Sequence, residues 1–117
     1  ATPEIYTLSL HDALPIYAVL ANLNPFRGCE PDSGTCVEVG FALAFGKPVV
    51  GYIASMETTL ERVWRLQGTG SVQGASRPVD RDGLHIENFG LPLNLMLAVP
   101  VRIVAGGLAE ALAALPA

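Results

Sequence analysis

The stretch that decides the fold is NLNPFRGCEPDSGTCVEVG, residues 22–40. It begins at the polar end of an apolar run, residues 17–23, whose length and flanking turn residues are typical of a buried parallel strand. Residues 24–33 hold two prolines and one glycine, which predicts a loop at the carboxyl end of that strand. An apolar segment follows, and we expect it to be a helix.

The predicted helix runs from about residue 34 to residue 45. Gly46 suits the position just after a helix, and Pro48 stands shortly beyond it. The segment is apolar almost all round, so we expect this helix to be buried. Its one charge is Glu38, and a buried carboxylate is costly unless something pairs with it or uses it.

Two interpretations of Glu38 follow from its position. The spacing from Thr35 to Glu38 fits a capping box, and Asp32 or Ser33 could also cap the helix. Alternatively, the helix dipole keeps Glu38 ionised, as a carboxylate nucleophile requires. The spacing alone leaves both interpretations open.

Residues 48–53 read as a second strand, and strand, helix and strand at this spacing form a parallel βαβ unit. We therefore expect an α/β fold with the strand over 18–23 central and next to the strand over 49–53. The other expected elements are a helix over 57–65, a loop over 67–83, a helix over 91–99 starting near Pro92, an extended piece at 102–104 and a helix over 107–115.

Composition narrows the function. The 117 residues suffice for one modest domain, and half of them are hydrophobic. The net charge of −4, with only seven Lys plus Arg, argues against a nucleic-acid surface. No run approaches the roughly 20 apolar residues of a membrane helix, and the first residues lack the positive region of a secretory signal. We expect a small-molecule substrate.

The metal-binding and redox residue types are sparse. Cys29 and Cys36 are too far apart for a CxxC pair, and four ligands for a structural zinc are not available. His11 and His85 have no acidic ligand pattern around them. No GxGxxG or GKS/T motif is present. We expect no metal, no cofactor and a reduced, cytoplasmic compartment.

Residues 22–40 resemble the signature of the nucleoside 2-deoxyribosyltransferase family. The resemblance continues through GKPVVGY at 46–52 and ENFGLPLNLML at 87–97, and covers about residues 18–115. It implies a flavodoxin-like parallel sheet flanked by helices, and an enzyme of nucleotide salvage that moves deoxyribose between bases.

The amino-terminal segment departs from the family pattern. Family members open with a strand, an AGP-like turn and a helical region, and usually carry Asp where Tyr17 stands and Asn or Asp where Ser9 stands. We therefore divide the chain into an atypical or foreign segment, 1–17, and a partial domain, 18–117, lacking the first strand-helix part. A gene fragment joined to unrelated coding sequence is our hypothesis. The strand over 18–23 should then have an unpaired edge.

The resemblance implies roles for four residues. Glu38 is the nucleophile that forms a deoxyribosyl ester, by the same logic as a retaining glycosidase. Asp32 helps to transfer a proton to the base. Asn94 binds the sugar 5′-hydroxyl in a neighbouring subunit's site, and Met96 reaches the same site. Without the resemblance, we would expect Asp32 to be an N-cap, Asn94 to lie on a helix surface and Met96 to lie in the core.

Three further residues belong to the predicted substrate site. Asn22 borders the loop, Phe26 offers a ring on which a base can stack, and Gly34 needs only a permissive backbone. Arg27 lies in the same loop, where an ion pair with Glu30 or Asp32 is the more common role for such a residue.

Other functions stay open at this point. A hydrolase of deoxynucleosides or their monophosphates on the same fold would use the same nucleophile, with water in place of the acceptor base. A catalytically inactive fragment or a nucleoside-binding domain is the alternative from another class. The segment 90–97 carries five large apolar residues in eight positions, which predicts an interface. The resemblance implies that this segment packs on a partner and lends Asn94 to the partner's sugar pocket, so we expect at least a homodimer with shared sites.

Overall fold

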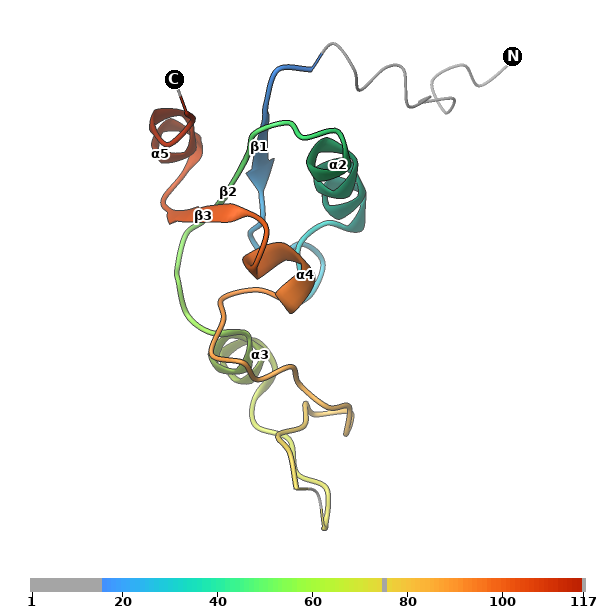
Figure 1. Ribbon diagram of the computed structural model, residues 1–117. Helices are drawn as coiled ribbons and strands as arrows, with labels where there is room; N and C mark the ends of the chain where they lie inside the picture. The colour runs from blue at the N-terminus through green and yellow to red at the C-terminus, as the bar shows by residue number, and fades with distance from the viewer. Residues whose placement is uncertain (1–15, 75, 117) are drawn as a thin grey trace, which may run out of the picture.

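The computed structural model describes residues 16–74 and 76–116. Three parallel strands form one sheet in this part of the chain: β1 (Val19–Asn22), β2 (Val49–Ile53) and β3 (Arg102–Ala105), in that order (Figure 1). In the register, Val19 stands opposite Val49, and Val50 stands opposite Arg102. The predicted α/β class and the parallel β1–β2 pair are confirmed.

The predicted central position of β1 is wrong for the sheet that the structure describes. β2 lies in the middle, and β1 pairs only with β2. The edge of β1 that faces away from β2 has no partner strand among the described residues, as expected for a partial domain. Residues 1–15, which include Ser9 and His11, lie outside the described residues, so the predicted boundary at residue 17 stays a prediction.

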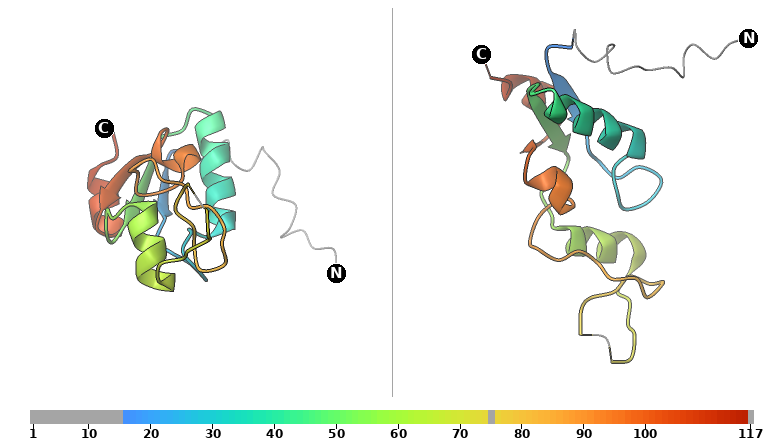
Figure 2. Two further views of the ribbon diagram at one scale, coloured as in Figure 1. Left: turned by 90° about the horizontal axis from the view of Figure 1, so that it is seen from below. Right: turned by 45° about the vertical axis from the view of Figure 1, so that its right-hand side comes forward.

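Helices cover both faces of the sheet. The helices α2 (Ser33–Ala44) and α4 (Leu95–Ala98) lie on one side, and α5 (Leu108–Ala113) packs on the strands from the other (Figures 1 and 2). The main core lies between the sheet and the helices α2 and α4. Its buried residues are Ala21, Leu23, Val39, Ala42, Val49, Ile53, Leu93, Leu97 and Val101.

Gly51 in β2 is required by this packing. A Cβ at this position would come within 2.4 Å of Cδ1 of Leu23, a side chain with no exposed surface. The glycine therefore lets Leu23, the first residue after β1, fill the space over the central strand. This contact fixes where the following loop begins.

The expectation of a buried α2 is wrong for half of its surface. Cys36, Val39, Ala42 and Leu43 face the core, whereas Val37 and Phe41 are 58% and 44% exposed. The sheet and α4 cover the helix from one side only, so its outer face meets solvent. Glu38 is also exposed, which removes the desolvation cost expected for a buried carboxylate.

A second, smaller core holds α3 (Thr59–Gln67) at the carboxyl end of the sheet. Its buried members are Cys29, Val63 and Ile86. The helix begins with a capping box, in which Thr58 and Glu61 satisfy each other's backbone amides at 3.2 and 2.8 Å. The predicted loop over 67–83 is confirmed for residues 68–74 and 76–83, apart from a single bridge between Val79 and His85, whereas Gln67 is the last residue of α3.

The helix predicted over 91–99 is reduced to the four residues of α4. The carbonyl of Leu91 accepts the amide of Thr59, and the carbonyl of Pro92 accepts the guanidinium of Arg62. These acceptors serve α3, so they are not available to a helical turn at 91–94. In the part of the chain that the structure describes, no helix is long and apolar enough to cross a membrane.

Candidate functional site

Asp32 begins the candidate site as the N-cap of α2. Its backbone is non-helical, and its Oδ2 accepts the amide of Thr35 at 2.9 Å and the hydroxyl of Thr35 at 3.1 Å. The carboxylate thus lies over the first turn of the helix, where it accepts a backbone amide that has no partner within the helix. The capping interpretation of Asp32 is confirmed, and it fixes the carboxylate in place.

Glu38 has no part in this cap. With Asp32 as N-cap, the third helical residue is Thr35, and α2 has no acidic residue in its first turn. The capping box predicted for Thr35 and Glu38 is therefore wrong. Glu38 lies in the second turn, exposed to solvent. Its carboxylate is not used to hold the helix.

Helix geometry brings the two carboxylates toward one end of α2. Residues three and four apart are neighbours on a helix, so Glu38 shares a face with Gly34 and Thr35. Side chains also lean toward the helix N-terminus. Asp32 is bound to Thr35 on that same face, although six residues separate it from Glu38. The prediction that both residues can border one pocket is compatible with this arrangement.

Gly34 protects the position of Asp32. A Cβ at residue 34 would stand 3.1 Å from Oδ2 of Asp32, closer than an ordinary contact. A larger side chain would push the capping carboxylate away from the helix. The predicted role of Gly34 as a permissive backbone is thus accompanied by a steric one.

Asn22 and its neighbours order the loop after β1. Oδ1 of Asn22 accepts the amide and the side-chain Nδ2 of Asn24, at 3.1 and 2.8 Å. Oδ1 of Asn24 in turn accepts the amide of Ala54, just beyond β2. These bonds join the carboxyl ends of the two strands, the place where open parallel sheets hold their ligands.

Phe26 stands 50% exposed at the tip of this loop. The guanidinium of Arg27 lies 5.1 Å from the centre of its ring. The predicted pairing of Arg27 with Glu30 or Asp32 is not among the ion pairs of the described residues; Arg27 has φ 53° and turns to the ring instead. Phe26 keeps an open face for stacking.

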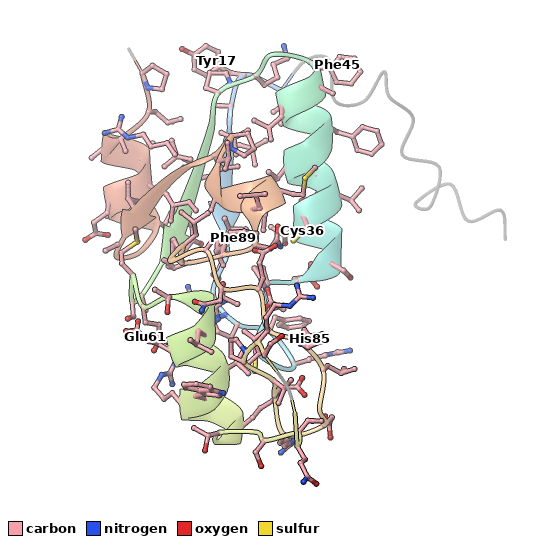
Figure 3. All side chains as sticks on the ribbon, turned by 60° about the horizontal axis from the view of Figure 1, so that its bottom comes forward. Tyr17, Cys36, Phe45, Glu61, His85 and Phe89 are labelled. Atoms are coloured by element: carbon pink, nitrogen blue, oxygen red, sulfur yellow. The ribbon has the colours of Figure 1, made fainter. Side chains whose placement is uncertain are left out.

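The surroundings at the base of the loop raise the pKa of two groups, Glu30 and Cys36. Burial raises the pKa of Glu30, although Arg62 opposes the rise, and the charge of Glu87 adds to it. Burial, helped by the charges of Asp32 and Glu30, also raises the pKa of the Cys36 thiol. Cys36 lies on the side of α2 toward α4 (Figure 3) and packs on the core, so it serves as a half-buried apolar residue.

A hollow of about 90 Å³ lies beside this loop, between the ends of β1 and β2 and the helix α3. Leu23, Asn24, Ile53 and Arg62 are among its lining residues. A nucleoside needs a pocket of roughly 300 Å³ or more. Neither Asp32 nor Glu38 lines this hollow. Within residues 16–74 and 76–116, no three His, Cys, Asp or Glu side chains converge to hold a metal ion.

The sequence model of the nucleoside 2-deoxyribosyltransferase family matches residues 16–96, more than half of the chain. The chain belongs to the nucleoside 2-deoxyribosyltransferase family. The family resemblance first indicated by residues 22–40 is confirmed.

Comparison with two proteins shows what share of their length this chain covers. A 2-desoxiribosyltransferase from Leishmania mexicana matches in structure with a TM-score of 0.68 and 33% identity, over 89% of this chain and 60% of that one. An uncharacterised protein of Schizosaccharomyces pombe is 32% identical in an alignment of 94 residues that covers 72% of this chain and 44% of the relative. The chain thus spans about half the length of the proteins it matches.

Two predicted site residues of this family chain lie in a second region. Asn94 is the N-cap of α4, and its Oδ1 accepts the amide of Leu97 at 3.2 Å. Met96 is 81% exposed, so the alternative that made it a core residue is wrong. Among the described residues, the side chain of Asp32 bonds to Thr35 and that of Asn94 bonds to Leu97, so each caps its own helix rather than bonding to the other.

Sequence reasoning missed Arg62, the residue that connects these regions. It is only 3% exposed and hydrogen-bonds to the loop after β1 and to the segment before α4. The local pattern around it, TLERVWRLQ, is that of an ordinary amphipathic helix, and nothing there separates Arg62 from Arg65. A buried arginine is recognised only when its distant partners are known.

Proposed function

We propose that this chain carries the nucleophile and the proton-transfer group of a nucleoside 2-deoxyribosyltransferase, which exchanges the base of 2′-deoxyribonucleosides. Membership of the family supports the transferase activity. The name of the Leishmania mexicana protein, with 33% identity, supports deoxyribose as the group that moves. The substrates are a deoxynucleoside and a free nucleobase.

The proposed reaction has two displacements at C1′ of the sugar. In the first, a carboxylate oxygen of Glu38 forms a bond to C1′ while the N-glycosidic bond breaks. The bonding electrons go to the leaving base nitrogen, which takes a proton from the carboxyl group of Asp32. In the second, a nitrogen of the acceptor base attacks C1′, the ester electrons return to Glu38, and Asp32 takes the proton that this nitrogen loses. The sugar configuration is retained.

The position of Asp32 is the single observation that carries this proposal. Its carboxylate is held over the first turn of α2 by Thr35, one turn before Glu38 and on the same face. Glu38 is exposed and takes no part in capping, so it is available to a substrate. A nucleophile and a proton donor at one helix end are what a double displacement needs.

Shared sites between copies complete the proposal. The segment around α4 leaves four large apolar residues uncovered, Phe89, Leu95, Met96 and Val99. A patch of this kind is typical of an interface. We propose that two copies associate through it and that each copy lends Asn94 and Met96 to the sugar pocket of the other. A second copy would also supply walls around Asp32 and Glu38, neither of which lines the hollow beside the loop after β1.

Base exchange tests the function directly. The chain is incubated with one deoxynucleoside, with and without a second free base, and the products are separated by chromatography. A new deoxynucleoside that contains the second base is expected. Free first base in equal amounts with and without the acceptor would identify a hydrolase instead. Rapid quenching and peptide mass analysis should place the deoxyribosyl group on the peptide that contains Glu38; a label elsewhere contradicts the assignment.

A further inference from the structure

The guanidinium of Arg62 spans two segments that are far apart in the chain. Its Nε donates to the carbonyl of Cys29 at 2.7 Å, and its Nη1 donates to the carbonyl of Pro92 at 2.5 Å. Its Nη2 lies 3.7 Å from a carboxylate oxygen of Glu30. The side chain of Arg62 is only 4% exposed, whereas that of Glu30 is 52% exposed, so the carboxylate stays in contact with water while the guanidinium is buried.

Both acceptor carbonyls belong to residues that lie two or three positions before a candidate site residue. Cys29 precedes Asp32 by three residues, and Pro92 precedes Asn94 by two. A further bond runs from the amide of Thr59, in the first turn of α3, to the carbonyl of Leu91 at 3.0 Å. The helix that carries Arg62 therefore contacts the backbone of both segments within a few residues of the proposed chemistry.

Such a contact is strong and specific for arginine. A charged donor makes hydrogen bonds about twice as strong as neutral ones, and a planar guanidinium offers donors in two fixed directions. A buried carbonyl that loses its donor keeps the full cost of desolvation. Arg65, the other arginine of α3, pairs with Glu57 instead.

We propose that Arg62 is a positioning residue that fixes the loop before Asp32 relative to the segment before Asn94. This inference rests on the function proposed above for Asp32 and Asn94. Because Asn94 is proposed to act in the site of a second copy, one Arg62 then orders an element of its own site and an element of its neighbour's.

The test compares Arg62→Met with Arg65→Met in the full chain. Arg65 supplies the matched control, since it lies on the same helix with its guanidinium 55% exposed. Amide hydrogen exchange is followed by mass spectrometry in three segments: residues 26–32, residues 91–97 and β2. In Arg62→Met we expect exchange in both of the first two segments to rise about tenfold, as for the loss of a charge-assisted bond, with β2 unchanged. In Arg65→Met we expect no change in any of them.

Three exchange results overturn the proposal. In Arg62→Met, faster exchange in one segment alone shows that Arg62 does not join the two. An equal rise in β2 shows that it supports the whole fold. The same pattern in Arg65→Met shows that any loss of charge from α3 has this effect.

Arg62→Lys is the second variant if Arg62→Met fails to fold. An ammonium group keeps the charge beside Glu30 but lacks the fork that reaches two carbonyls. We expect faster exchange in at least one segment, by a smaller factor than in Arg62→Met. Exchange identical to that of the native chain in both segments means that the charge suffices, and the proposal fails.

Base-exchange kinetics separate positioning from mere stability. If Arg62 only stabilises the fold, Arg62→Met lowers the active fraction and hence kcat, while KM for the deoxynucleoside stays the same. Positioning of a proton-transfer loop and a sugar-binding segment predicts that kcat falls and KM rises together. Unchanged KM contradicts the proposal. If the native chain exchanges no bases, the proposed function fails, whereas hydrogen exchange still decides whether Arg62 joins the two segments.

Discussion

Two regions carry the candidate site residues, and they are held in place in different ways. In residues 22–40 the side chains of the candidate site residues make local bonds: Asn22 binds Asn24, and Asp32 binds Thr35, two and three residues away. The bonds of Arg62, in the second region, are distant, since Arg62 reaches back 33 residues to Cys29 and forward 30 residues to Pro92. The caps and turns are therefore fixed by neighbouring residues, whereas the positions of the two regions relative to each other depend on distant contacts.

The difference also concerns exposure. In the first region, Glu38 lies on the solvent-exposed face of α2, and Cys36 and Val39 lie on the face of the same helix that packs against the core. In the second region, Met96 and several apolar residues near it in the sequence are exposed to solvent. This difference motivates the proposal that the first region carries the nucleophile and that the second carries association between copies.

The largest expected effect belongs to the first region. Glu38→Gln removes the nucleophile while keeping the size of the side chain. Base exchange should fall by more than about 10³-fold, since a residue that acts in a covalent step is rarely replaceable. The side chain is exposed and caps nothing, so stability to urea should stay within about 0.5 kcal/mol. Native-like activity in this variant would show that Glu38 is an ordinary surface residue.

Asp32 allows its two roles to be separated by a pair of variants. Asn at an N-cap accepts the Thr35 amide as Asp does, so Asp32→Asn should fold normally but lose about 10²–10⁴-fold in base exchange. Asp32→Ala should lose the same activity and also about 0.5–2 kcal/mol of unfolding free energy. Denaturant melts and base-exchange rates measure the two effects. Full activity in Asp32→Asn would leave capping as the only role of this residue.

The contrast between local and distant bonds explains what the sequence predicts and what it does not. The strand at 18–23, the loop after it and the end of α2 before Gly46 depend on residues close in the chain, and their prediction is confirmed within a residue or two. The extent of α4 and the burial of α2 depend on what packs against them. Periodicity carries no information about a partner 30 residues away, and so Arg62 also went unpredicted.

The same contrast applies to Asn94, whose proposed role depends on a second copy. Glu38→Ala and Asn94→Ala are each expected to be inactive alone. When both chains are mixed and allowed to exchange partners, one hybrid site keeps both native residues, and about a quarter of the native base exchange should return for a two-fold dimer. Light scattering checks the association. An absence of rescue between two associating variants would assign Asn94 to the site of its own chain.

The smallest effect comes from the ion pair at the outer surface of α3. The hydrogen bond from Arg65 holds the pKa of Glu57 below its ordinary value of 4.5. A folded-state pKa that is lowered adds stability above the unfolded pKa, and this stability is lost as the pH falls through the folded pKa. Glu57→Gln should therefore lower the melting temperature slightly at pH 7, by less than the loss of the Asp32 cap. The difference from the native chain should shrink below a pH of about 4.5 and also in high salt, because exposed pairs are screened. A difference that persists at low pH would show that Glu57 acts through packing, and then α3 would depend on its surface as well as on Arg62.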